Sequence, residues 1–416
     1  MSSEWRECSL DDVAELTGGY AFKSSQYQSN GVFVLRTLNI GDDGSITQGD
    51  AVFVSDADAR EFSRFQLCEK DILFVMVGAT LGKIGKVSKS ILPALLNQNM
   101  WRIRARRDLV DQDFLYYSFK ECVLEIIGWA SGSARGFLRR DDCRSLRISL
   151  PTLEEQKEIA HILGTLDDKI ELNRKTNETL EAMAKALFKS WFVDFDPVRA
   201  KVEGRPTGLP DEISELFPDS FEDSELGEIP RGWSVAALSD IARISTGKRP
   251  ESVADFRSSA NHIPVYGGAG VMGYTRNALT DGEPILATGR VGTLGVVNRV
   301  LEKAWISDNT LIVNPGKSDF VYVYHFLLTQ DLKSLNRGST QPLLSQTELK
   351  SLPIARPPQS LLSTFCELTQ HWQERQASLL KDDVNTKALL DTLLPKLISG
   401  QIRIPDAERM LEEAGV

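Results

Sequence analysis

One stretch of the sequence, residues 151–195, limits what this chain can fold into. Its apolar residues recur at steps of three and four with charged residues between them, and no proline follows Pro151. This spacing predicts a helix with one apolar face. Pro151 suits a helix entry, and Thr152 with Glu155 has the form of a capping box. A helix of roughly 38 residues would be about 57 Å long. That is too long for one ordinary domain to cover, so it needs a partner helix.

The same chain supplies the predicted partner helix. Residues 357–400 repeat the pattern, and the two stretches align without a gap when Pro151 is placed on Pro357. Apolar residues then match apolar residues along both stretches, which predicts the contacts of a helix pair. The residues expected to pack this pair are Ile162, Leu166, Ile170, Leu187, Leu368, Trp372, Leu390, Leu393 and Leu397.

The repeat continues upstream of both helices, with small gaps. Solenoid repeats are much shorter than this one. The sequence therefore predicts one unit, a globular domain followed by a long helix, that is present twice. Matching segments outside the helices are Trp5 with Trp233, residues 72–73 with 285–286, 80–82 with 293–295, and 132–133 with 338–339.

Each globular domain is predicted to be mixed α+β, because short strand-like runs between Gly, Asp and Asn turns precede a helical pattern. The link between the two repeats is acidic and punctuated by proline, and we expect it to be extended and packed outside the helices. The C-terminal tail is expected to be a short capping element. The predicted segments are residues 1–150 (first domain), 151–192 (first long helix), 193–232 (connector), 233–356 (second domain), 357–400 (second long helix) and 401–416 (tail).

Composition places the chain among ordinary soluble proteins. It has 416 residues, of which 42% are hydrophobic and 25% charged, enough to bury real cores. The sequence shows no signal peptide and no membrane span, and its five cysteines follow no pairing pattern, so a cytoplasmic location is expected. The net charge of −10 is uneven: acids gather in the connector and arginines at 102–107 and 135–147. Nucleic-acid binding depends on such local faces, so the total charge does not exclude it.

No catalytic or metal-binding constellation is predicted. Residues 268–273 satisfy G-x-G-x-x-G, but a poor helix start follows and the acid of a dinucleotide site is missing, which favours a glycine-rich turn. Residues 78–84 approach a P-loop but are one residue short, and Ile84 replaces the required Ser or Thr, which favours a strand–turn–strand. The four histidines have neither metal nor triad spacing. Two alternatives stay open: an enzyme that acts alone on nucleotides or nucleic acid, and a coiled-coil scaffold without DNA affinity.

Basic and polar loop residues are the remaining functional candidates. Arginine can bond guanine, and glutamine adenine, through two hydrogen bonds, and both also reach phosphates. The alternative for each residue is a solvated loop, and for the one tyrosine the domain core is favoured. The candidate DNA-binding residues are Lys23, Arg36, Arg135, Arg139, Arg140, Lys248, Arg249, Tyr266, Arg290 and Gln341.

Several longer motifs resemble one known family. The sequence reads P-T-L-E-E-Q-K-E-I-A-H-I-L from residue 151 and A-L-F-K-S-W-F-V-D-F-D-P-V from residue 186, and G-R-V-G-T-L-G with S-D-N-T follows in the second domain. With these motifs, and L-F-P-D-S-F-E-D-S-E-L-G-E-I-P-R-G-W and I-P-V-Y-G-G-A-G-V-M-G-Y, nearly the whole chain resembles the specificity (S) subunit of a type I restriction–modification system. One departure is Pro357-Pro358-Gln359, which lacks the Glu-Gln after the first proline.

This resemblance implies a fold and a set of partners. Two target-recognition domains would be joined by two long antiparallel helices with pseudo-two-fold symmetry. Each domain would read one half of a bipartite site in double-stranded DNA, and the helices would set the gap. Two methyltransferase (M) subunits would bind S-adenosylmethionine and methylate adenine at N6, while two restriction (R) subunits would use ATP and Mg. The chain itself would bind no cofactor and carry no catalytic residue.

Overall fold

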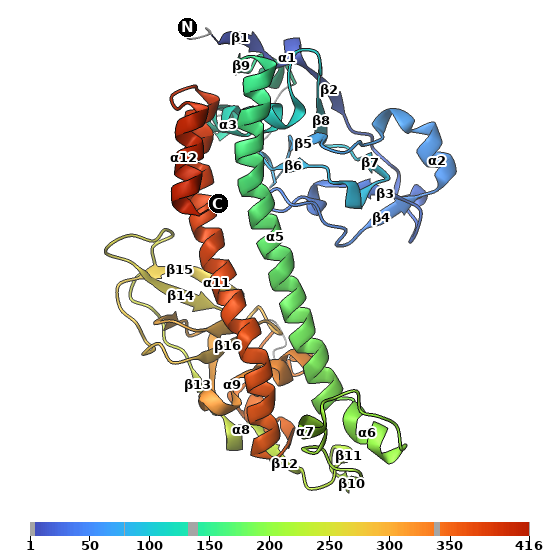
Figure 1. The fold of residues 1–416 in the computed structure, drawn as a ribbon, viewed down its shortest axis with the longest axis vertical. Helices are drawn as coiled ribbons and strands as arrows, with labels where there is room; N and C mark the ends of the chain where they lie inside the picture. Colours follow the sequence, from blue (N-terminus) through green and yellow to red (C-terminus); the bar gives the residue numbers. More distant parts are fainter. Residues whose placement is uncertain (1–4, 79, 132–139, 337–341, 416) are drawn as a thin grey trace. The chain divides into compact units, whose positions relative to one another are not determined.

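The structure, a computed structural model, describes residues 5–78, 80–131, 140–336 and 342–415 (Figure 1). These residues form two compact units. Unit 1 comprises Met1–Arg174 and Leu380–Val416, and unit 2 comprises Lys175–Leu379. The two predicted long helices are confirmed, each with 40 residues. From the sequence, each long helix was predicted as a segment of its own. In the structure, one part of each helix belongs to unit 1 and the other part to unit 2. The long helices are α5 (Leu153–Phe192) and α11 (Gln359–Ile398).

Unit 1 is built on two small sheets. A four-stranded antiparallel sheet has the order β2-β8-β5-β6, and a three-stranded sheet has the order β4-β3-β7, in which β3 and β7 are parallel. The elements are β1 (Arg6–Ser9), α1 (Leu10–Val13), β2 (Ala14–Gly18), β3 (Val32–Leu35), β4 (Val52–Val54), α2 (Asp56–Glu61), β5 (Ile72–Val75), β6 (Ile84–Lys86), β7 (Ala94–Leu96), β8 (Met100–Ala105), α3 (Gln112–Ser131), α4 (Arg140–Arg144) and β9 (Arg147–Leu150).

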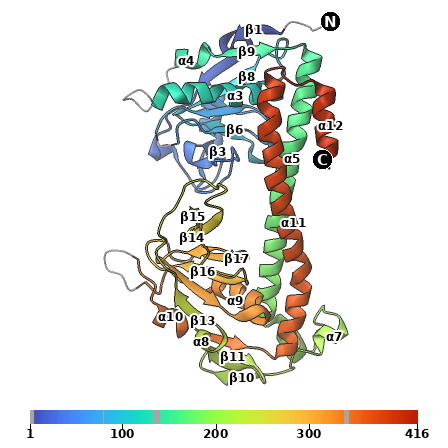
Figure 2. The same cartoon turned by 90° about the vertical axis from the view of Figure 1, so that its left-hand side faces the viewer.

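Unit 2 repeats this plan. Its four-stranded sheet has the order β13-β19-β16-β17, and its three-stranded sheet β15-β14-β18 again contains one parallel pair, β14 and β18. Figure 2 labels β14 and β15 of the smaller sheet and β13, β16 and β17 of the larger one. The elements are β12 (Ser234–Ala237), α8 (Leu238–Ile241), β13 (Arg243–Thr246), β14 (Ile263–Gly267), β15 (Gly270–Thr275), β16 (Ile285–Gly289), β17 (Val297–Val300), β18 (Trp305–Ile306), β19 (Thr310–Asn314), α9 (Gly316–Thr329), α10 (Gln346–Lys350) and β20 (Pro353–Arg356).

The two units agree in hydrogen bonding as well as in strand order. The N–H of Leu10 donates to the carbonyl of Leu146 at 2.8 Å in unit 1, and that of Leu238 donates to Leu352 at 2.9 Å in unit 2. These bonds join the first short helix of each unit to the segment that leads into its long helix. The predicted duplication is therefore present in the fold.

In unit 1 the two long helices share one core with the domain. The predicted packing residues Ile162 and Leu166 of α5 are buried together with Leu390, Leu393 and Leu397 of α11. Each such side chain contributes about 1.5–3 kcal/mol by leaving water. Ile170, which was also predicted, is half-buried against the same core.

Polar contacts fix the position of α5 in unit 1. Asn173 of α5 donates from its amide nitrogen to the Asp383 carboxylate of α11 at 2.8 Å. Tyr117 of α3 donates its hydroxyl to Asp167 of α5 at 2.7 Å. Burial and the nearby Asp167 raise the pKa of Tyr117, so the phenol stays a donor.

In unit 2 an aromatic core holds the helix pair. The ring of Phe188 on α5 lies 6.0 Å from Phe365 on α11, while Gln376 donates to Glu181 at 3.3 Å. Residues later in α5 thus meet residues earlier in α11, so the helices are antiparallel. The predicted Leu187 is half-buried against this core.

Leu368 corrects the predicted contact face of α11. Its side chain is 38% exposed, while Phe365 and Thr369 are buried. The predicted Trp372 is half-buried. The buried face here includes a threonine whose hydroxyl donates to the Phe365 carbonyl at 2.8 Å. The match of apolar residues predicted Leu368 in the buried face of α11, but its neighbour Thr369 is the buried residue.

The acidic connector is folded rather than extended, which corrects the prediction. It forms two short helices and a hairpin, and its apolar residues Phe195, Val198, Phe217 and Ile229 enter the unit 2 core. Acidic residues face solvent between these anchors. The elements are α6 (Asp196–Val202), α7 (Asp211–Ser214), β10 (Phe221–Ser224) and β11 (Gly227–Pro230).

The C-terminal tail forms a helix on unit 1. α12 (Ile404–Ala414) buries Ala407 in the unit 1 core, and Met410 and Leu411 pack against it. This agrees with the expected short capping element.

Candidate nucleic-acid interface

Three loops of unit 2 meet at one end of the strands of its four-stranded sheet. They are residues 246–249, 289–293 and 306–310, and we call them the unit 2 loop cluster. They lie together because β13 and β16 end where the antiparallel β19 begins. The N–H of Arg290 donates to the carbonyl of Asn309 at 2.8 Å, which ties the second loop to the third.

Glycines let these backbones touch. A Cβ atom on Gly247 would lie 2.3 Å from the carbonyl oxygen of Ser307, and one on Gly289 would lie 1.7 Å from that of Thr293. Gly268, the first glycine of the G-x-G-x-x-G stretch, lies against Gly289. That stretch joins β14 to β15 as a hairpin, so the predicted glycine-rich turn is confirmed and no strand–helix dinucleotide motif is formed. The residues near Lys83 likewise form the predicted strand–turn–strand, between β5 and β6.

The cluster carries cationic side chains on a backbone that is fixed by hydrogen bonds. The Lys248 N–H donates to Ile306 at 2.8 Å, and its carbonyl accepts from the Trp305 indole at 2.7 Å. The side chains of Lys248 and Arg249 are exposed, and Arg290 is half-exposed. Exposed cations on fixed backbone suit contacts to phosphates or base edges.

Tyr266 lies on the core side of this cluster. It is half-buried and packs against a small buried cluster that includes Ile285, Ala287 and Val300. Burial raises its pKa, with Glu302 adding to the shift. This placement favours the core interpretation of the tyrosine.

Unit 1 contains the same backbone frame, formed by residues 18–20, 75–78 and 96–100. The Gly19 N–H donates to Met100 at 3.1 Å, as that of Gly247 donates to Thr310 at 3.0 Å. A Cβ on Gly19 would lie 1.8 Å from a carbonyl oxygen, the same close approach as at Gly247. We call these residues the unit 1 loop cluster.

The side chains on the two frames differ. The Tyr20 N–H bonds Leu96 at 3.1 Å in the place where Lys248 bonds Ile306, and the Met76 N–H bonds Asn99 at 3.0 Å where Arg290 bonds Asn309. Tyrosine and methionine thus stand where unit 2 has lysine and arginine. Both side chains are half-buried: Tyr20 stacks on Phe62 at 4.4 Å, and Met76 packs against the unit 1 core. Neither residue was predicted from the sequence. An alignment of Gly19 with Gly247 would have pointed to Tyr20.

The other basic candidates of unit 1 are placed differently. Lys23 is exposed, but the Arg36 guanidinium donates to the Asp50 carbonyl and so helps to hold its own loop. In the arginine-rich segment 102–107, the Arg104 guanidinium makes two 2.7 Å hydrogen bonds to the buried Asp71. That arginine supports the fold rather than a basic face.

Four candidates cannot be placed in this way. Arg135, Arg139 and Gln341 lie outside the described residues, and Arg140 begins α4 without a described side chain.

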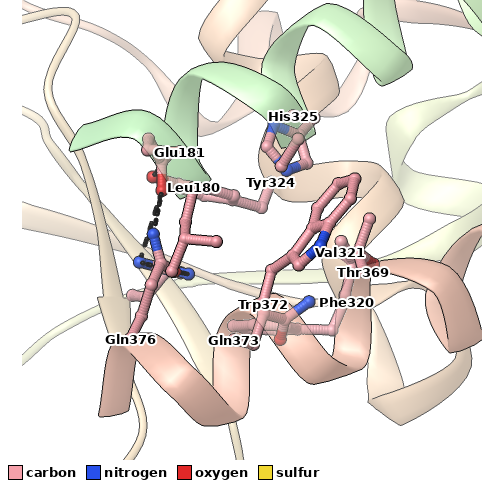
Figure 3. Close-up of a pocket in the computed structure, with 12 residues that line it drawn as sticks. Leu180, Glu181, Phe320, Val321, Tyr324, His325, Thr369, Trp372, Gln373 and Gln376 are labelled. Carbon is pink, nitrogen blue, oxygen red and sulfur yellow. Dashed lines mark hydrogen bonds and ion pairs between the residues drawn. The ribbon is translucent and has the colours of Figure 1, made fainter. Parts of the chain in front are cut away.

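A polar network joins the unit 2 sheet to the helix pair (Figure 3). Figure 3 shows Glu181 of α5 facing Gln376 of α11 beside Tyr324 of α9. The Tyr324 hydroxyl donates to Glu181 at 2.9 Å, and Arg299 of β17 lies 3.6 Å from the same carboxylate. Arg299 also donates to the Gln376 oxygen at 3.3 Å. β17 pairs with β16, which ends in the loop cluster, so this network sets the sheet against the helices.

Neither a metal-ligand group nor a helix able to span a membrane is found in the described part of the chain. No group of three His, Cys, Asp or Glu there could hold a metal ion. No helix there is both long enough and apolar enough to cross a bilayer.

Comparison with known proteins agrees with this geometry. The family model described as "Type I restriction modification DNA specificity domain" matches residues 2–182 and 230–396. The chain belongs to this family. Each matched segment contains the globular domain of one unit, so the two specificity domains correspond to the two repeats.

Curated relatives carry the same name. The HindI type I restriction enzyme specificity subunit of Haemophilus influenzae is 28% identical over 325 residues, 63% of this chain and 70% of that protein. The MjaIX specificity subunit of Methanocaldococcus jannaschii is 28% identical over 352 residues, 78% of this chain and 76% of that protein. This chain is therefore a type I specificity subunit with two target-recognition domains.

A solved structure shows the same fold. The type I S subunit from M. genitalium has a TM-score of 0.55 and 17% sequence identity, and the match covers 95% of this chain and 96% of that one. The predicted fold class is confirmed: α+β recognition domains, present twice, with two long helices.

Proposed function

We propose that the two target-recognition domains of this specificity subunit read the two different halves of one bipartite, asymmetric site in double-stranded DNA. The observation that carries this is the common backbone frame of the two loop clusters. The same frame carries Tyr20 and Met76, which pack against core residues, in unit 1 but the cations Lys248 and Arg290 in unit 2. Similar frames would approach DNA in similar ways, and different side chains would contact different bases.

We also propose that catalysis belongs to partner subunits. Two methyltransferase subunits would bind S-adenosylmethionine, methylate adenine at N6 and dock on the helix pair, which would set the spacer between half-sites. Two restriction subunits would join with ATP and Mg, all in the cytoplasm. Exposed apolar residues on α11 support a protein partner: Leu380 is 58% and Val384 is 70% exposed, and a step of four puts them on one helix face.

The test of the half-site assignment is an Arg290→Ala variant, assembled with its methyltransferase subunits. An arginine contact to a base is worth about 1–3 kcal/mol, so methylation at low enzyme concentration should fall about tenfold or more. Selectivity should relax only in the half-site that unit 2 reads. The control is Arg231→Ala, an exposed arginine beside the β10–β11 hairpin that should leave methylation unchanged.

The result that contradicts the assignment is equal relaxation of both half-sites in Arg290→Ala. An equal loss in Arg231→Ala would likewise show that general charge, rather than a specific contact, is responsible.

A further inference from the structure

A loop of unit 2, residues 248–262, begins in the loop cluster and returns close to it. It starts at Lys248, whose N–H donates to Ile306, and it leads into β14. In β14, the Tyr266 carbonyl accepts a 2.9 Å hydrogen bond from the N–H of Ser307. The loop therefore starts in the cluster and leads into β14, whose Tyr266 is bonded to the next residue of the same cluster.

The middle of this loop is apolar and exposed. Phe256 is 84% exposed, Val253 is 38% exposed and Met272 on the neighbouring β15 is 55% exposed. Ala254 pairs with Tyr274 through two 2.8 Å backbone hydrogen bonds, so the loop is attached to β15. An exposed aromatic side chain does not gain the free energy of burial. Exposed apolar side chains that lie near one another on a surface indicate a contact site.

The charges around the ring suit a nucleic acid. Phe256 lies between Asp255 and Arg257, both exposed, while exposed Arg249 and Glu251 lie earlier in the loop. With Lys248 the loop carries three cations and two anions. An exposed ring beside an arginine can enter a base stack while the guanidinium group reaches a neighbouring phosphate.

We propose that Phe256 is an apolar wedge that inserts between stacked base pairs of the half-site read by unit 2. DNA-binding proteins insert phenylalanine, leucine or methionine in this way and locally unstack a base step. The wedge would add selectivity for base steps that unstack easily, such as TA or CA. This inference rests on the proposed function.

The experiment uses the complete complex of this chain with its methyltransferase subunits. Its probe is a duplex that carries the motif assigned by methylation mapping, with 2-aminopurine placed in turn at each step of the second half-site. The wild-type complex should raise the fluorescence severalfold at one step, because unstacking relieves quenching. Phe256→Ala should abolish that rise and bind about tenfold more weakly. Phe256→Trp should retain both effects.

The matched control is Leu226→Ala, because Leu226 is an exposed apolar residue (42%) in the turn between β10 and β11. It should bind and unstack DNA like the wild type. Fluorescence that is equal in Phe256→Ala and wild type, or that does not rise in the wild type, overturns the wedge. Loss of methyltransferase assembly in Phe256→Ala would instead identify a protein-docking residue and also overturn it. If the wild-type complex binds the motif no more tightly than a scrambled duplex, the result contradicts the proposed function itself rather than the wedge alone.

Discussion

His325 makes the stability of unit 2 depend on pH. It lies in the cavity of Figure 3, is 4% exposed and stacks on Phe188 at 5.6 Å. Burial lowers the pKa of this histidine to about 4, while Glu181 opposes the shift and Arg299 and Lys185 add to it. The imidazole is therefore neutral in the folded protein at pH 7.

The size of the effect follows from the two pKa values. An unfolded histidine titrates near pH 6.5, and a shift down to about 4 corresponds to about 3 kcal/mol at 1.36 kcal/mol per pH unit. Because the folded pKa is the lower one, the unfolded state takes up the proton first. The full stability is present above pH 6.5 and is lost as the pH falls from 6.5 towards 4.

The assay is urea unfolding of the full chain between pH 7.5 and 4.5. His325→Leu removes the titrating group. Between pH 7.5 and 4.5 the wild type should therefore lose up to about 3 kcal/mol more unfolding free energy than this variant. His371→Leu is the control, because the side chain of His371 is 88% exposed, and it should keep the wild-type pH dependence. Equal pH dependence in wild type and His325→Leu would refute the reasoning.

Three further predictions concern the core, a buried ion pair and DNA binding. Leu393→Ala, at a fully buried site of α11, should cost about 3 kcal/mol of unfolding free energy, whereas Leu380→Ala at a 58% exposed site should cost under about 0.5 in the same denaturation assay. Asp71→Asn leaves Arg104 without its carboxylate and should destabilise the chain by about 3 kcal/mol, and an unchanged midpoint would contradict this. DNA binding by the complex should weaken at least about tenfold between 50 and 200 mM salt, since phosphate contacts release counterions, and salt-independent binding would argue against the DNA role.

The sequence predicted the elements that follow a simple period. The helix pair could be found because its apolar spacing persists over forty residues, and most of its packing residues were identified. Leu368 was misassigned because the buried face there includes Thr369, whose hydroxyl is satisfied within its own helix. The connector was taken as extended because its many acids outweighed a few apolar anchors, such as Phe195 and Phe217.

The candidate site was only partly accessible to sequence reasoning. Its cations could be named, but the loops that carry them lie far apart in the chain and meet through glycine contacts. Gly19 and Gly247 follow the matched Trp5 and Trp233 at the same spacing, so Tyr20 could have been aligned with Lys248 from the sequence. The contacts of these glycines with carbonyls far along the chain are visible only in the structure. The equivalence of Met76 and Arg290 also became visible only there.

The most direct test of the account is a genome-wide map of N6-methyladenine in the source cell, with and without the gene for this chain. The account predicts that one bipartite motif with two different half-sites loses its methylation when the gene is removed and regains it on complementation. If the methyltransferase subunits are expressed and every methylated motif is the same with and without the gene, this chain does not direct methylation and the central claim is wrong.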